Sequence, residues 1–165
     1  MNTLFSHVCV VTMDDRMSVW TDAFVGVTDG KISYLSKHAP EEKPDQIIDA
    51  TGMVLMPGLI NCHTHLPMQL LRGYADDLKL QEWLNDYIFP REDRLDGRCV
   101  RAATTLAVAE CLKFGVTSVS DMYYFCDDIC DVIAKSGMKA NISRGTSMFL
   151  GDDFDFEKFP ACQEL

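Results

Sequence analysis

Two histidines separated by one residue are the strongest chemical signal in the sequence. His63 and His65 follow an apolar run that begins at Val54. In a strand, residues i and i+2 point to the same face, so we expect both imidazoles to share one space while Thr64 points the other way. Imidazole nitrogen binds Zn²⁺ and neighbouring divalent ions at about 2.0–2.1 Å. The pair therefore predicts two ligands of one metal ion, although two histidines at a strand end are often only polar surface or satisfied core groups.

The segments around this pair predict a parallel sheet whose strands alternate with helices. Nearly continuous apolar runs are typical of strands buried on both faces, and apolar residues at three- and four-residue steps are typical of helices. Active sites in such sheets lie at the carboxyl ends of the strands, where the two histidines stand. The expected elements are strands at 54–60, 116–121 and 138–143 and helices at 93–114 and 127–135.

The first 55 residues predict a small antiparallel β unit. Apolar, β-branched runs at 5–12 and 23–28 are followed by Asp29-Gly30 and a further alternating run. Asp-Gly between alternating runs favours a hairpin, because a type I′ turn needs positive φ at both central residues. A short strand is expected at 47–50.

Length and charge narrow the function classes. A chain of 165 residues is about one domain long, and 25 acidic against 15 basic residues give a formal net charge of −10. Because phosphate backbones and anionic lipids bind clustered Lys and Arg, we expect neither nucleic acid nor membrane as a partner. The N-terminus lacks a basic region and a long apolar region, so we expect no signal peptide and a cytoplasmic location.

The seven cysteines show no paired spacing of the kind that a zinc finger needs. In a reducing compartment most are expected to pack as small buried hydrophobes. Cys126 and Cys130 lie four apart on an expected helix and could share a metal, but no second pair accompanies them. Core packing is the better interpretation.

The sequence resembles the amidohydrolase superfamily. Residues 56–65 (MPGLINCHTH) are similar to the first-strand motif PGxIxxHxH of that family. Residues 66–78 (LPMQLLRGYADDL), 82–84 (EWL) and 89–92 (FPRE) resemble the branch that contains 5-methylthioadenosine/S-adenosylhomocysteine deaminases and triazine chlorohydrolases. The resemblance spans residues 1–147.

The resemblance implies a metal-dependent (β/α)₈ TIM barrel preceded by a small β-sandwich. Residues 1–55 would form the N-terminal part of the sandwich subdomain, and residues 56–165 the first three βα units of an incomplete barrel. It also implies one divalent metal, with Zn²⁺ first and Fe²⁺ or Mn²⁺ as alternatives, that activates water for attack on an aminated ring carbon. The full-length form would be a hydrolytic deaminase of an adenosine-type nucleoside and a homo-oligomer with a small-molecule substrate.

The resemblance also assigns individual residues. His63 and His65 would be metal ligands, Trp83 would pack beside the nucleoside, Glu92 would accept hydrogen bonds from ribose hydroxyls, and Arg144 would lie near the distal group of the substrate. From the residues alone, Trp83 could equally be a core anchor on a short helix, Glu92 a charge at a helix start, and Arg144 a structural or solvated cation. Asp121 ends the second expected strand and is not included in the predicted site.

Several parts of the family's site are missing from the sequence. The other two histidines, His7 and His38, belong to the β unit, and no HxxE pattern follows the pair His63 and His65. A catalytic zinc takes three protein ligands, and such a barrel needs about 250 residues. We therefore interpret the chain as the N-terminal part of a longer enzyme, inactive by itself. The alternatives are a triazine- or guanine-type aminohydrolase or chlorohydrolase, or a non-catalytic remnant or subunit that completes a barrel with another chain.

Overall fold

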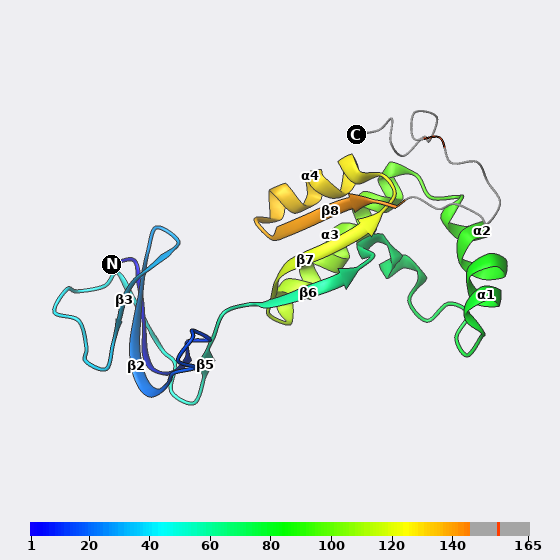
Figure 1. Ribbon diagram of the computed structural model, residues 1–165. Helices are drawn as coiled ribbons and strands as arrows, with labels where there is room; N and C mark the ends of the chain where they lie inside the picture. Colours follow the sequence, from blue (N-terminus) through cyan, green and yellow to red (C-terminus); the bar gives the residue numbers. More distant parts are fainter. Residues whose placement is uncertain (146–154, 156–165) are drawn as a thin grey trace. The chain divides into compact units, whose positions relative to one another are not determined.

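The computed structural model describes residues 1–145 and residue 155 (Figure 1). The chain divides into two compact units, Met1–Pro57 and Gly58–Leu165. We call them unit 1 and unit 2 and describe each by itself.

Unit 1 is a mixed β-sheet with the strand order β3-β2-β1-β4, in which β5 also pairs with β1. The pairs β1/β2 and β2/β3 are antiparallel, whereas β4 and β5 run parallel to β1. The expectation of a purely antiparallel unit was wrong, because residues 37–45 return the chain to the end of the sheet where β1 begins, so that β4 runs parallel to β1. The strands are β1 (Thr3–Val11), β2 (Val19–Thr28), β3 (Lys31–Ser36), β4 (Gln46–Asp49) and β5 (Val54–Leu55).

The hairpin and the core of unit 1 follow from local sequence. Asp29 and Gly30 both have positive φ, 50° and 73°, which confirms the turn predicted between β2 and β3. Alternation along the strands directs small and β-branched side chains to one face. The buried cluster consists of Val8, Val10, Ala23, Val25 and Ala50.

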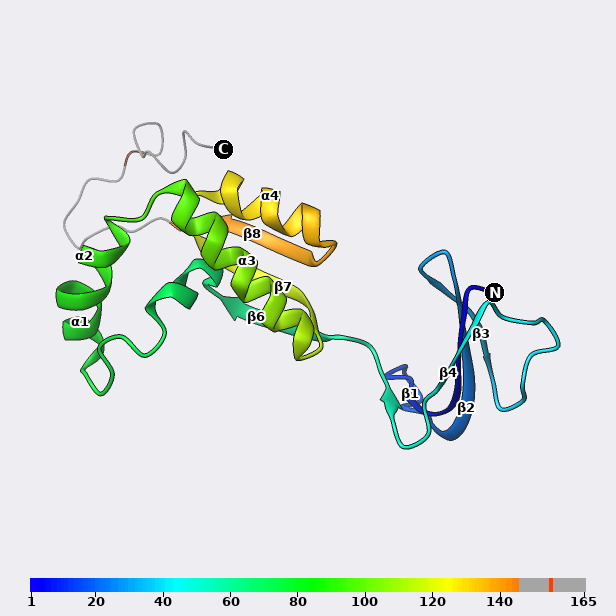
Figure 2. The same ribbon diagram turned by 180° about the vertical axis from the view of Figure 1, so that it is seen from behind.

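Unit 2 contains a parallel sheet with the order β6-β7-β8, as the alternating pattern predicts. Helices α3 and α4 connect the strands, and Figures 1 and 2 show both on the same side of the sheet. Their apolar stripes and β7 enclose one core, which includes Val100, Val108, Val119 and Ile129. The elements are β6 (Leu59–Thr64), α3 (Gly97–Lys113), β7 (Val116–Tyr123), α4 (Cys126–Ser136) and β8 (Lys139–Arg144).

The ends of the two helices have identifiable causes. Helix α3 begins after Asp96, whose side chain accepts a hydrogen bond of 2.8 Å from the backbone N–H of Cys99. It therefore starts later than the apolar periodicity from residue 93 predicts. Gly115 and Gly137 follow α3 and α4 with φ of 79° and 75°, a left-handed conformation that glycine adopts without steric cost.

Strand β6 differs from the expectation of one strand buried on both faces. The apolar run 54–60 is divided between β5 in unit 1 and β6 in unit 2. Leu59 and Ile60 are 52% and 68% exposed. Both residues lie at the start of β6, which is an edge strand of the sheet within residues 58–145, so their side chains remain exposed.

Between β6 and α3 the chain forms short helical pieces that sequence periodicity did not resolve. Leu80 to Glu92 is continuously helical but changes its winding, with a π-helical stretch in the middle. Within the described residues, no helix has the length and apolar character needed to cross a membrane. The pieces are η1 (Leu66–Leu71), α1 (Leu80–Glu82), η2 (Trp83–Ile88) and α2 (Phe89–Glu92).

Candidate functional site

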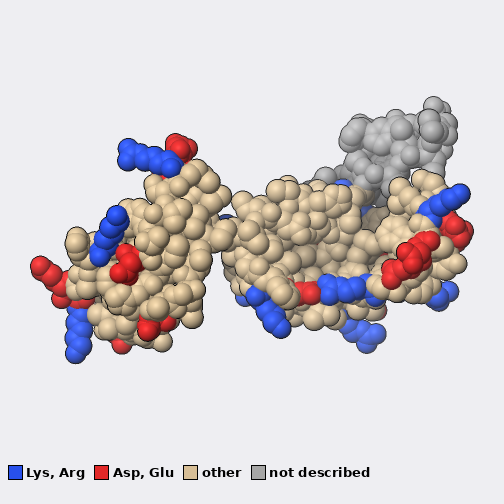
Figure 3. Space-filling model, turned by 90° about the horizontal axis from the view of Figure 1, so that it is seen from below, with Lys and Arg blue, Asp and Glu red and all other residues tan. Residues whose placement is uncertain are grey.

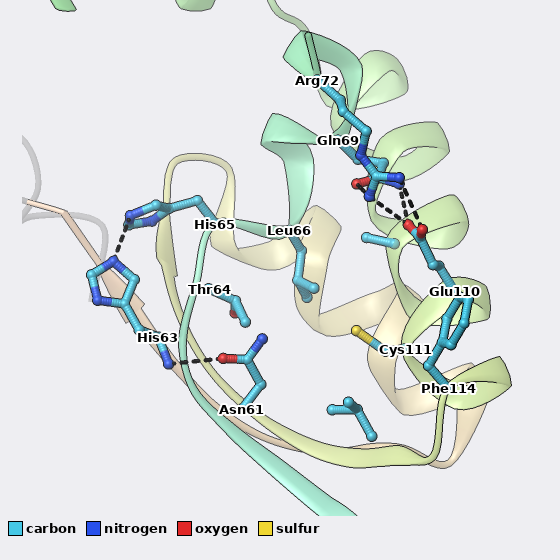
Figure 4. A pocket seen from close by; sticks show the side chains of 12 residues that line it. Asn61, His63, Thr64, His65, Leu66, Gln69, Arg72, Glu110, Cys111 and Phe114 are labelled. Atoms are coloured by element: carbon cyan, nitrogen blue, oxygen red, sulfur yellow. Dashed lines mark hydrogen bonds and ion pairs between the residues drawn. The ribbon is translucent and has the colours of Figure 1, made fainter. Parts of the chain in front are cut away.

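His63 of β6 and His65, which directly follows the strand, lie on one side of the chain. Their Nε2 atoms are 3.3 Å apart, and Figure 4 shows both imidazoles on the side opposite to Thr64 and Leu66. Two nitrogen ligands at about 2.05 Å from a tetrahedral ion lie about 3.3–3.4 Å apart. The spacing of His63 and His65 thus fits two corners of such a site.

A backbone carbonyl fixes the proton on His65. The Nδ1 atom of His65 lies 2.7 Å from the carbonyl oxygen of Met122 on β7. Because a carbonyl only accepts, Nδ1 must carry the hydrogen, which leaves the Nε2 lone pair directed at His63. In the hydrogen bond between the two rings, His63 Nε2 is then the donor. Ligating histidines commonly make this kind of second contact, which orients the ring and sets its tautomer.

Asp121 on β7 forms hydrogen bonds with the residues on either side of His65. The Asp121 side chain is 1% exposed, and its Oδ1 atom accepts hydrogen bonds from Thr64 Oγ1 at 2.6 Å and from the Leu66 N–H at 2.7 Å. Burial raises the pKa of the Asp121 carboxyl, and the two hydrogen bonds act in the opposite direction. Sequence reasoning left Asp121 out of the site, although its position at a strand end was the available signal.

A cavity of about 500 Å³ brings together four of the five residues predicted for the site: His63, His65, Trp83 and Glu92. The histidines come from the end of β6 and the residue after it, and Trp83 and Glu92 come from the continuous helical segment that begins at Leu80. An apolar cavity with a few convergent polar groups is typical of small-molecule sites. Its other lining residues are Met68, Leu80, Leu84, Ile88, Phe89, Met122, Tyr123, Tyr124 and Gly145.

Glu92 is held by a buried tyrosine. The hydroxyl of Tyr123 donates a hydrogen bond of 2.6 Å to Glu92 Oε1. Burial, together with Glu92, raises the pKa of Tyr123, so its hydroxyl remains a donor. Glu92 is the last residue of α2 and of the continuous helical segment that begins at Leu80. Tyr123 was missed because strand β7 extends two residues beyond the predicted end at 121.

The remaining predicted residues differ in where they lie. Trp83 is half-buried and lines the cavity, so it is not a fully buried core anchor. Arg144, at the end of β8, lies outside this cavity: its guanidinium stacks 4.7 Å above the ring of Tyr124 and its Nη1 donates to the carbonyl oxygen of Gly145. It lines a separate cavity of about 400 Å³ that also contains Asp127.

A further hollow of about 390 Å³ opens beside β6 toward α3 (Figure 4). Here Arg72 after η1 forms an ion pair of 2.6 Å with Glu110 of α3, and Gln69 donates to the same carboxylate. This exposed network fastens η1 to α3 and so supports the segment that follows the histidines.

The donor set for a metal is only partial within residues 1–145 and 155. His63 and His65 fit together, but these described residues contain no group of three or more His, Cys, Asp or Glu side chains arranged to hold an ion. Cys126 and Cys130 do not belong to such a group either, and Cys130 is exposed.

Comparison with known proteins identifies relatives of the chain. Residues 54–134 match the model of the amidohydrolase family. A 5′-deoxyadenosine deaminase of Methanosarcina acetivorans is 41% identical over 142 residues, which are 86% of this chain and 33% of that protein. A 5-methylthioadenosine/S-adenosylhomocysteine deaminase of Pelotomaculum thermopropionicum is 39% identical over 147 residues, 87% of this chain and 34% of that protein. The chain thus spans about a third of the length of these relatives.

Solved structures show the same fold. An adenosine deaminase of Xanthomonas campestris with bound zinc has a TM-score of 0.77 and 36% identity, and the match covers 84% of this chain and 33% of that one. An atrazine chlorohydrolase of Arthrobacter aurescens, complexed with zinc, also has a TM-score of 0.77, at 23% identity over 86% of this chain and 35% of that one. These matches confirm the expected α/β fold, the first part of a (β/α)₈ barrel with its preceding β-sheet unit.

Proposed function

We propose that this chain, whose residues 54–134 match the model of the amidohydrolase family, supplies the first metal ligands and much of the substrate cavity of a hydrolytic deaminase. The proposed substrates are adenosine-type nucleosides of the 5-methylthioadenosine/S-adenosylhomocysteine class. One observation carries the proposal: His63, His65, Trp83 and Glu92, which are up to 29 residues apart in sequence (63 to 92), line one cavity.

We assign the metal to the histidine pair. His63 and His65 would hold one divalent ion, Zn²⁺ first and Fe²⁺ or Mn²⁺ as alternatives, since imidazole suits all three. Such an ion supplies Lewis-acid activation of water near neutral pH. The chain's own contribution is the orientation of the two rings, with His65 held through its Nδ1–H to the Met122 carbonyl.

The rest of the cavity suits a flat, aminated base joined to a sugar. Trp83 offers an aromatic face for the base, and the apolar side chains around it keep water away from the ring. Glu92 offers carboxylate oxygens to ribose hydroxyls, and Tyr123 orients that carboxylate through one of them. Arg144 would reach the distal group only from the neighbouring cavity, which shares Tyr124 with this one.

We also propose that the 165-residue chain has no deaminase activity by itself. Deamination needs a proton carrier and at least one more metal ligand, and residues 1–145 and 155 contain no group of three or more His, Cys, Asp or Glu side chains that could hold an ion. We therefore expect no ammonia release from the 165-residue product, and we propose that the complete protein is a homo-oligomer. In this assignment residues 1–55 belong to a sandwich subdomain and residues 56–165 to the barrel.

A small-molecule substrate agrees with the charge of the chain. The formal net charge is −10, and on the face in Figure 3 Lys and Arg side chains stand among acidic ones and form no broad patch. Nucleic acid and anionic membrane are thus poor partners, and we propose a cytoplasmic location. The likeness to the atrazine chlorohydrolase, at 23% identity, supports the fold alone, so we do not propose the triazine reaction.

Tryptophan fluorescence tests the substrate assignment. The chain has two tryptophans, so Trp20→Phe leaves Trp83 as the reporter within the cavity. We expect 5′-deoxyadenosine to quench Trp83 in the presence of Zn²⁺, and Glu92→Gln to weaken this binding about tenfold. Glu41→Gln, a change in unit 1, is the matched control and should leave it unchanged. Equal binding by the Glu92→Gln variant, or stronger binding of atrazine than of the nucleoside, would contradict the proposal.

A further inference from the structure

Asp121 occupies an unusual place for a carboxylate. It is almost fully buried, and its Oδ1 atom accepts from Thr64 Oγ1 at 2.6 Å and from the Leu66 backbone N–H at 2.7 Å. Thr64 and Leu66 directly precede and follow His65 in the chain. One carboxylate oxygen therefore holds the strand on both sides of a proposed metal ligand.

Stability alone does not account for this residue. The second carboxylate oxygen, Oδ2, is also buried and has no hydrogen-bond partner among residues 1–145. Burying a carboxylate, and leaving one of its oxygens unpaired, opposes folding. An apolar side chain at this position of β7 would avoid that cost. The benefit of Asp121 is instead local, because its two hydrogen bonds end on Thr64 and Leu66, the residues on either side of His65.

We propose that Asp121 is a positioning residue for the histidine pair. By fixing Thr64 and Leu66, it keeps the His65 ring in place, with Nδ1 2.7 Å from the Met122 carbonyl and Nε2 3.3 Å from His63 Nε2. Asp121 acts from the opposite side of β6 and contacts neither substrate nor ion. The inference rests on the proposed metal-binding role of His63 and His65 and names the residue that sets their geometry.

The tautomer of His65 tests this role without any metal. The chain has four histidines, and His7 and His38 lie in unit 1, so imidazole ¹⁵N spectra contain two reporters and two internal references. At a pH where the rings are neutral, we expect His65 to show one tautomer, with the proton on Nδ1. Asp121→Ala should give averaged tautomers, whereas Asp121→Asn should resemble the wild type because its amide oxygen still accepts both hydrogen bonds.

Zinc titration gives the second readout. Asp121→Ala should weaken Zn²⁺ binding about 10- to 100-fold, the usual effect of removing an outer-shell partner, and Asp121→Asn should change it less than about threefold. Ile129→Ala is the matched control, because Ile129 lies fully buried in the same unit. It should lower the melting temperature and leave zinc affinity unchanged.

Each outcome decides the proposal. Wild-type tautomer and zinc affinity in Asp121→Ala would overturn it, and an equal loss of affinity in Ile129→Ala would reduce Asp121 to a structural residue. If Asp121→Ala does not fold, Thr64→Val removes one of the two hydrogen bonds, and an unchanged His65 tautomer in that variant would overturn the role. If the wild type binds no zinc, the proposed function fails at the metal, while the tautomer comparison still decides Asp121.

Discussion

The two units of the molecule bury different kinds of residue. The core cluster of unit 1 consists of valines and alanines from β1 and β2 and from the turn after β4, and the polar residue that this unit buries is an uncharged serine, Ser6. Unit 2 has an apolar core of similar kind, but it also buries Asp121, the hydroxyl-bearing ring of Tyr123 and Thr104. Asp121 and Tyr123 bond to residues at the cavity or beside the histidines, which shows where polar groups are retained against their burial cost.

Because of this difference, we expect substitutions that affect folding stability to be distinct from those that affect ligand binding. Changes in unit 1 should alter how firmly its sheet folds, whereas changes at the end of β6 or β7 should alter ligand binding with smaller effects on folding. The three experiments below test that separation, from the largest expected effect to the smallest.

The largest effect is expected at the histidine pair. His65→Ala removes one of two nitrogens that lie at coordinating spacing, so Zn²⁺ binding by the chain should fall more than about 100-fold, as measured by calorimetry. His38→Ala, in unit 1, is the control and should bind as the wild type does. Equal loss in both variants would show that the zinc is bound elsewhere.

A core truncation in unit 1 should lower the stability of the protein and not its affinity for zinc. Val8 is 2% exposed, and Val8→Ala removes two methyl groups from the centre of the sheet. We expect a destabilisation of about 2 kcal/mol in urea unfolding, with zinc affinity unchanged. A marked loss of zinc binding would mean that the histidine pair depends on unit 1, and the separation would fail.

Local sequence patterns were sufficient for much of the fold. Apolar periodicity predicted a helix at 93–114, which forms at 97–113, and a strand at 116–121, which forms at 116–123; the Asp29-Gly30 turn follows from the φ angles that it requires. The common side of His63 and His65 follows from the two-residue period of a strand. Each of these is decided within a few residues, where steric and hydrophobic preferences act directly.

Long-range contacts determine the strand pairing and side-chain placements that local sequence patterns did not predict. The parallel pairing of β4 with β1 depends on residues more than 40 apart, and Tyr123 meets Glu92 across 31 positions. The placement of Arg144 is decided by stacking on Tyr124, since a strand period gives a face but not the final direction of a long side chain. Such contacts are visible only once the sheet is assembled.

The smallest effect concerns the cap of α3, which belongs to unit 2 but not to the cavity. Hydrogen bonds from Cys99 lower the pKa of Asp96, so the carboxylate stabilises the folded state above the ordinary pKa of Asp. This stabilisation is lost as the pH falls through the lowered value in the folded state.

Asp96→Ala should therefore lower the melting temperature slightly at pH 7, and the difference from the wild type should vanish in acid. Asp76→Ala, at an exposed loop position, is the control and should match the wild type at both pH values. Zinc affinity should not change in either variant, because Asp96 caps a helix that packs on the side of the sheet away from the imidazoles. If the cap variant lost zinc binding, the histidine geometry would depend on the whole of unit 2 and not on the ends of β6 and β7.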